Sequence, residues 1–219
     1  MRSHLDHGLE SFVLPRVSRD PGTAVELLLT LREVASAEVA VVLLTAIAAA
    51  PLCEVAAPPF SLALFGATGA RKTSLAAVAQ SCFGSFGYSS LAASFESTAN
   101  AIALTLCLAK DALVVVDDLL RDPHGNRMAA ANQLIRSQAN RAARQRLKSD
   151  GSEGISYPPR GLMLFTAEQR PDSGAEQCCA GLVCTSASRS GQPRGADAAP
   201  TRVGAPSARA AGLHPVHSR

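Results

Sequence analysis

Apolar positions near the N-terminus follow helical spacing. In residues 23–35 apolar side chains recur at helical intervals between charged ones, and residues 37–50 are apolar almost throughout. The first pattern is typical of an amphipathic helix and the second of a buried helix. The apolar run of residues 39–53 is shorter than the roughly 20 residues needed to cross a bilayer. We therefore expect a pair of helices here and no membrane span.

Continuous apolar runs farther along the chain predict β-strands. The clearest is LVVVDDLL, residues 113–120, whose β-branched side chains are typical of a strand buried on both faces. Stretches with helical spacing separate the runs, and alternating strands and helices are typical of a parallel sheet. The predicted strands begin at Ser61, Leu91, Leu113 and Gly161, and the predicted helices between them span about residues 73–83, 98–110 and 128–143.

The segment from Ser61 to Val78 reads SLALFGATGARKTSLAAV, which predicts a strand, a glycine-bearing turn and a helix in succession. This order approximates the phosphate-binding P-loop, G-x-x-x-x-G-K-[ST]. In such a loop backbone N–H groups face an anion, and the following helix adds the positive end of its dipole. Arg71 stands where the motif has its second glycine, and Gly69 can supply the backbone freedom instead. The alternative is an ordinary strand-to-helix turn with a solvated Arg–Lys pair.

The P-loop interpretation assigns nucleotide contacts to the turn and the start of the helix. Lys72 would reach the β- and γ-phosphates of ATP, and the Thr73 hydroxyl would hold Mg²⁺. The predicted nucleotide-binding residues are Gly66, Ala67, Thr68, Gly69, Ala70, Arg71, Lys72, Thr73 and Ser74.

Polar residues end two of the predicted strands. Asp117 and Asp118 close the strand of residues 113–120, at the edge where open α/β sheets bind ligands. In a nucleotide hydrolase, Asp117 would take Mg²⁺ through water, and Asp118 would orient or deprotonate the attacking water. Thr166 ends the last strand, where it could sense the γ-phosphate or that water. The alternatives are an aspartate-containing turn and a strand that merely ends in a polar residue.

The most basic segment follows the third predicted strand. One alternative for it is a solvated helix face, and another is an arginine that completes a neighbouring subunit's site. Contact with the phosphate backbone of a nucleic acid is a third. The residues concerned are Arg136, Arg141, Arg144, Arg146 and Lys148.

Composition changes this picture little until the C-terminal part of the chain. The net charge of +3 is too small to indicate a nucleic-acid partner by itself, and the six cysteines lack metal-site spacing. The N-terminus has no secretory signal pattern, so we expect a reduced, cytoplasmic protein. Residues 171–219 are rich in alanine, arginine, proline, serine and glycine without periodicity, which predicts a disordered tail.

Four stretches together resemble a known class of ATPase. They read GATGARKTSLAAVAQ, STANAIALTLCLAKDALVVVDDL, QLIRSQANRAARQRL and PPRGLMLFTAEQ. The order of elements resembles P-loop ATPases with an additional strand between their two nucleotide motifs, the AAA+ and RecA-like proteins. More narrowly, these stretches resemble helicase-like ATPases of actinobacterial mobile elements over about residues 23–170.

The resemblance implies a three-layer α/β P-loop NTPase fold with a mostly parallel sheet, preceded by a helical pair. It implies ATP and Mg²⁺ as cofactors, DNA as a partner and a homo-oligomeric ring or filament. Mg²⁺ would lie at Thr73 and Asp117, with Thr166 as the sensor and an arginine finger at Arg141 or Arg144. The catalytic residues would be Lys72, Asp118, Thr166 and these two arginines.

The expected domains are a flexible N-terminus (1–22), a helical segment (23–57), an ATPase core (58–170) and the disordered tail. The core is incomplete at its C-terminal end, because such domains continue after the sensor strand and here the tail follows. A fifth strand should pair with the strand that begins at Ser61. Only Gly181–Cys184 is a candidate, and it is short. We therefore expect that strand's edge to be exposed or covered by the N-terminal helices.

Two departures leave other functions open. Arg71 in the P-loop leaves turnover less certain than binding, and the tail's composition is that of out-of-frame translation of GC-rich DNA. The leading hypothesis is an ATPase that acts on DNA. The main alternative is a non-catalytic, truncated nucleotide-binding remnant or interaction module, and a small-molecule P-loop kinase is a weaker one.

Overall fold

The computed structural model describes residues 9–13, 20–120, 122–142, 156–168 and 179–183. All of them belong to one compact unit, Met1–Ser188. Within these residues no helix is both long and apolar enough to span a membrane.

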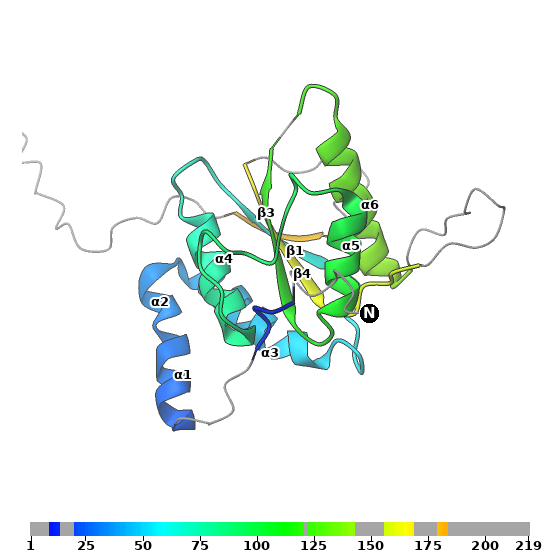
Figure 1. Cartoon of the computed structure of the whole chain (residues 1–219). Helices are drawn as coiled ribbons and strands as arrows, with labels where there is room; N and C mark the ends of the chain where they lie inside the picture. The colour runs from blue at the N-terminus through cyan, green and yellow to red at the C-terminus, as the bar shows by residue number, and fades with distance from the viewer. Residues whose placement is uncertain (1–8, 14–19, 121, 143–155, 169–178, 184–219) are drawn as a thin grey trace, which may run out of the picture. The chain divides into compact units, whose positions relative to one another are not determined.

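A five-stranded sheet forms the centre of this unit (Figure 1). Its strand order is β2-β3-β4-β1-β5, and every neighbouring pair is parallel. The α/β class with a parallel sheet, predicted from the alternation of apolar runs and helical spacing, is therefore confirmed. The strands are β1 (Ser61–Phe65), β2 (Ala93–Ser94), β3 (Leu113–Leu119), β4 (Leu162–Ala167) and β5 (Cys179–Val183).

Strand β5 corrects two of the predictions. It pairs with β1 from Ser61↔Cys179 to Phe65↔Val183, so the edge of β1 is neither exposed nor left to the N-terminal helices. Disorder throughout residues 171–219 is also wrong for residues 179–183, and the rest of that range lies outside the described residues. The physical reason is that β1 offers a row of backbone N–H and C=O groups, which a short strand can satisfy despite its weak side-chain pattern.

Helices flank the sheet in the order that the sequence predicts. The expected helix of residues 23–35 is divided at Thr30, and Asp20 caps its first part by accepting hydrogen bonds from the N–H groups of Gly22 and Thr23. The helices are α1 (Pro21–Leu29), α2 (Leu31–Val34), α3 (Ala37–Ala49), α4 (Lys72–Gln80), α5 (Ala99–Leu108) and α6 (Asn126–Asn140), with 3₁₀ turns at Ala50–Leu52 and Ser81–Phe83.

Two hydrophobic clusters lie on opposite faces of the sheet. Alternate residues of β1 show the division, since Leu62 and Leu64 join α3 and α4 whereas Ala63 and Phe65 join α5 and α6. This is the period of two expected of a strand, and both faces are covered (Figure 1). The result is three layers, with α3 and α4 on one side and α5 and α6 on the other. Helix α3 belongs to the same cluster as β1, so the N-terminal helical segment is part of the core.

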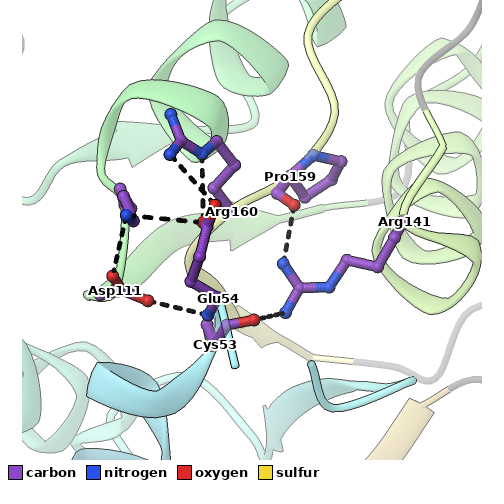
Figure 2. A network of polar contacts seen from close by, with 7 residues as sticks. Cys53, Glu54, Asp111, Arg141, Pro159 and Arg160 are labelled. Carbon is purple, nitrogen blue, oxygen red and sulfur yellow. Dashed lines mark hydrogen bonds and ion pairs between the residues drawn. The ribbon is translucent and has the colours of Figure 1, made fainter. Parts of the chain in front are cut away.

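A polar network at the amino-terminal edge of the sheet ties this segment to the strands (Figure 2). The Arg141 guanidinium donates to the carbonyl oxygens of Pro159 (2.8 Å) and Cys53 (3.0 Å). Beside it, Arg160 donates twice to the Glu54 carboxylate, at 3.3 Å for each bond. Lys110 and Asp111, from the loop before β3, complete the network. The two residues after the 3₁₀ turn Ala50–Leu52 are thus held by the end of α6 and by the loop before β4, respectively.

Replacing Arg141 tests whether this network supports the fold. Arg141→Ala should lower the free energy of unfolding by about 2 kcal/mol, because two carbonyls lose a charged donor. Arg136→Ala on the same helix is the matched control, since Arg136 is exposed and should change stability by less than about 0.5 kcal/mol. Urea denaturation measures both values. Equal stability of the two variants would contradict a structural role for Arg141.

Candidate functional site

The carboxyl ends of β1, β3 and β4 meet at one edge of the sheet, because all three strands are parallel. The segments that leave this edge surround a pocket of about 230 Å³. Polar and charged residues dominate its wall, as expected at the edge where open α/β sheets bind ligands. The residues lining it are Thr68, Gly69, Arg71, Lys72, Thr73, Asp118, Thr166, Ala167 and Glu168.

The loop between β1 and α4 has the backbone of an anion-binding turn. Gly69 has φ 82° and Arg71 has φ 59° and ψ 22°, so both residues are left-handed. Arg71 occupies the N-cap of α4, where a left-handed residue turns the chain into the helix. A non-glycine residue in this conformation is disfavoured by about 1 kcal/mol. The position that holds glycine in the P-loop motif therefore has a glycine-like backbone here, although its residue is arginine.

Two substitutions of Arg71 test this backbone. Arg71→Gly should be more stable to unfolding than Arg71→Ala by about 1 kcal/mol, because only glycine adopts the left-handed conformation without a steric cost. Both variants lack the guanidinium, so the comparison isolates the backbone. Urea denaturation measures the difference. A more stable alanine variant would contradict the left-handed conformation of this residue.

Lys72 lies in the first turn of α4 with its ammonium group directed back toward the loop. Its Nζ atom donates to the carbonyl oxygens of Gly66 (2.7 Å) and Ala67 (3.0 Å). A positive charge is thereby held beside the left-handed turn and the N-terminus of a helix, both of which favour anions. This arrangement brings a lysine, free backbone donors and a helix dipole to one side of the pocket.

Asp117 links three segments of the chain. Its Oδ1 atom accepts hydrogen bonds from Thr73 Oγ1 (3.0 Å) and from Thr166 Oγ1 (2.5 Å). The Thr166 hydroxyl in turn accepts from the backbone N–H of Asp118 at 2.9 Å. Because Thr166 is only 2% exposed, these bonds fix its hydroxyl at the pocket wall. Asp117, predicted at one strand end, is therefore in direct contact with Thr166 from another strand end and with Thr73 from the start of a helix.

Asp118 lies on the pocket wall in a strained conformation. Its φ is 63°, and the β3–β4 register shifts between Val116 and Leu119, so one extra β3 residue forms a bulge. Partial desolvation and, after it, the Asp117 carboxylate raise the pKa of Asp118 above its ordinary value, while Arg127 opposes them. Strain and a raised carboxyl pKa at one residue are typical of functional positions.

The site gathers most of the predicted residues but not all. Gly66 and Ala67 contact the Lys72 side chain, whereas Ala70 is buried and Ser74 does not line the pocket. Arg141 lies at the opposite edge of the sheet, bonded to the carbonyls of Cys53 and Pro159. An arginine finger at a neighbouring subunit's site stays a prediction for this residue. Arg144, Arg146 and Lys148 lie outside the described residues.

Sequence reasoning missed two charged residues near the pocket. Glu168 lines it and accepts a hydrogen bond from the Thr68 hydroxyl. Arg127, in the first turn of α6, lies 3.7 Å from the carboxylate of Glu96 and lowers the pKa of Asp118. The sequence contains a signal for Glu168. Residues two apart along an extended strand point to the same side, and Glu168 follows the predicted site residue Thr166 by two positions. Arg127 had no comparable signal in the sequence.

The chemistry of this site fits a polyphosphate and a hard divalent cation. Thr73 and Asp117 supply oxygen atoms, which Mg²⁺ prefers, and no group of three or more His, Cys, Asp or Glu side chains in the described residues could hold a metal. A magnesium ion here would therefore take ligands from phosphate and water as well, which is its usual behaviour. The loop and Lys72 supply the matching anion site.

Comparison with known proteins places the chain in a family. Residues 22–154 match the family described as a domain of unknown function, DUF927. No curated protein matches the chain. The matched region contains the loop, Lys72 and the aspartate pair, and it ends before β4. Since this match covers more than half of the sequence, the chain belongs to the DUF927 family.

Proposed function

We propose that the chain binds ATP with Mg²⁺ at this pocket and hydrolyses it. The observation that carries the proposal is the contact of Asp117 with Thr73 and Thr166 beside a loop that holds Lys72. An ordinary strand-to-helix turn explains the loop alone. It does not explain why a lysine, two threonine hydroxyls and two aspartates converge on the pocket.

The P-loop supplies the phosphate-binding part of the proposed mechanism. Lys72 would leave the carbonyls of Gly66 and Ala67, at least in part, to pair with the β- and γ-phosphates. Loop N–H groups and the positive end of α4 would hold the remaining oxygens. Position and charge rather than covalent chemistry account for most catalysis of phosphoryl transfer.

The two aspartates have different roles in the proposed mechanism, one in metal binding and one in activating water. Mg²⁺, when bound, would neutralise developing charge on the phosphates. Thr73 and Asp117 have the oxygen atoms to hold it. Asp118 would orient the attacking water and accept its proton, and its raised pKa makes it a better base than an ordinary aspartate. Thr166 would report on the γ-phosphate through its bonds to Asp117 and to the Asp118 backbone.

The proposed partner is DNA, and the proposed role is that of an ATP-driven motor or switch. Both proposals follow the resemblance to helicase-like ATPases. The observation in support is a partly exposed, mostly polar face at α6 and its C-terminal end, around a depression of about 550 Å³. Arginine and amide side chains suit a sugar-phosphate backbone. The residues of this face are Ala129, Asn132, Gln133, Arg136, Ser137, Asn140 and Ala142. A ring or filament of identical subunits is part of the same proposal.

Arg71 favours a second candidate, a nucleotide-binding module without turnover. It replaces a glycine of the motif, has a left-handed backbone and lines the pocket. A bulky cation there can leave binding intact while it displaces the γ-phosphate from the position that hydrolysis requires.

Phosphate release by the purified wild type distinguishes the candidates. Release that single-stranded DNA accelerates supports a DNA-acting ATPase, and release that DNA leaves unchanged supports an ATPase with another partner. Saturable ATP binding without release under either condition supports the non-catalytic module. Absence of any ATP binding would contradict both.

A further inference from the structure

We propose that Glu168 is a specificity-determining residue that makes this pocket select the magnesium complex of the nucleotide over the metal-free form. The inference rests on the proposed nucleotide site. It concerns a residue to which neither the P-loop motif nor the aspartate pair assigns a role.

Glu168 is held against the phosphate-binding loop. It follows β4 directly and accepts a hydrogen bond from the Thr68 hydroxyl in the loop. A backbone bond from Gly66 N to Ala167 O, 3.3 Å long, fixes the two segments side by side. Glu168 and Thr68 both line the pocket. The bond from Thr68 therefore holds the carboxylate itself, and the backbone bond holds the segment that carries it, beside the space that a polyphosphate would occupy.

The charges around this space do not suit a bare polyphosphate. Asp118 and Glu168 line the pocket and Asp117 adjoins it through Thr166, whereas the lining cations are Arg71 and Lys72. Lys72, one of these two cations, is already bonded to two carbonyls.

A fixed carboxylate repels a ligand in proportion to the ligand's charge. Metal-free ATP carries roughly twice the net negative charge of its magnesium complex, so the energetic penalty from Glu168 should be about twice as large. If Glu168 weakens the affinity for MgATP by a given factor, it should weaken the affinity for metal-free ATP by about the square of that factor. Glu168 thus raises the magnesium dependence of binding without contacting the ion.

The substitution Glu168→Gln isolates the charge, because an amide oxygen still accepts the Thr68 hydrogen bond. Titration calorimetry with ATP is carried out in excess magnesium and again in excess EDTA. We expect affinity for MgATP to rise about threefold and affinity for metal-free ATP about ninefold. The ratio of the two affinities should therefore fall about threefold relative to wild type.

Two controls separate charge from structure. Glu168→Asp keeps a negative charge at this position, and it should leave the magnesium dependence within about a factor of 1.5 of wild type. Glu38→Gln removes an exposed carboxylate at the start of α3, outside the pocket, and should change neither affinity. Thermal melts confirm that each variant is folded.

The outcomes are distinguishable. If wild type binds neither form of ATP, the proposed nucleotide site fails and this inference fails with it. If wild type binds MgATP and Glu168→Gln has the same ratio of affinities, only the role of Glu168 is overturned. A fall in the ratio for Glu168→Gln, absent from both controls, supports the assignment.

Discussion

Asp118→Asn is expected to bind ATP and Mg²⁺ with wild-type affinity and to hydrolyse ATP at least about 100-fold more slowly. The amide keeps the shape of the side chain but cannot accept the proton of the attacking water. The fold should survive, because asparagine tolerates the left-handed backbone that Asp118 adopts at φ 63°. Phosphate release at saturating ATP measures the rate, and calorimetry measures the affinity.

Asp111→Asn is the matched control for this variant. Asp111 is also an aspartate with a left-handed backbone, at φ 54°, but it lies in the network at the opposite edge of the sheet (Figure 2). We expect its turnover to equal that of wild type. Equal turnover in Asp118→Asn as well would remove Asp118 from the mechanism.

The pH dependence of turnover provides a second measurement on the same residue. Desolvation and Asp117 raise the pKa of Asp118, so its charged form is lost at a higher pH than in an ordinary aspartate. Wild-type hydrolysis should therefore fall as the pH decreases through this raised pKa, while ATP binding persists. A rate that stays constant down to the ordinary aspartate range would show that another group is the base.

The helices and the long strands could be predicted because their side-chain patterns extend over many residues. LVVVDDLL predicted β3, and the structure forms it at Leu113–Leu119 with the first four residues fully buried. The same reasoning predicted that β1 needs a second neighbour from beyond residue 170. The one candidate there, Gly181–Cys184, is discounted as too short, whereas the structure forms the strand at Cys179–Val183, five residues whose alanine and glycine give no decisive period. Strand β5 forms through backbone pairing with β1, and backbone pairing leaves little trace in composition.

The site was predictable where a motif or a strand end marks it. Lys72, Thr73, Asp117 and Thr166 could be assigned to one edge because parallel strands place their carboxyl ends together. Arg141 could not be placed, because charge alone does not distinguish a finger at a ligand from a donor to backbone carbonyls. Its bonds to Pro159 and Cys53 depend on how α6 ends relative to the loop before β4, which only the tertiary structure determines.

Lys72→Ala should lower affinity for MgATP at least about 100-fold, which corresponds to about 2.8 kcal/mol. The substitution removes the ammonium group that contacts the loop and leaves the carbonyls of Gly66 and Ala67 exposed to an approaching phosphate. Lys110→Ala is the matched control, because Lys110 pairs with Glu54 and Asp111 at the opposite edge of the sheet.

The most direct test of the nucleotide site is one calorimetric titration series with MgATP on wild type, Lys72→Ala and Lys110→Ala. A nucleotide site at this pocket predicts saturable binding to wild type and Lys110→Ala, and no detectable binding to Lys72→Ala at the same concentrations. Equal affinity in wild type and Lys72→Ala, or no binding to folded wild type, would contradict it.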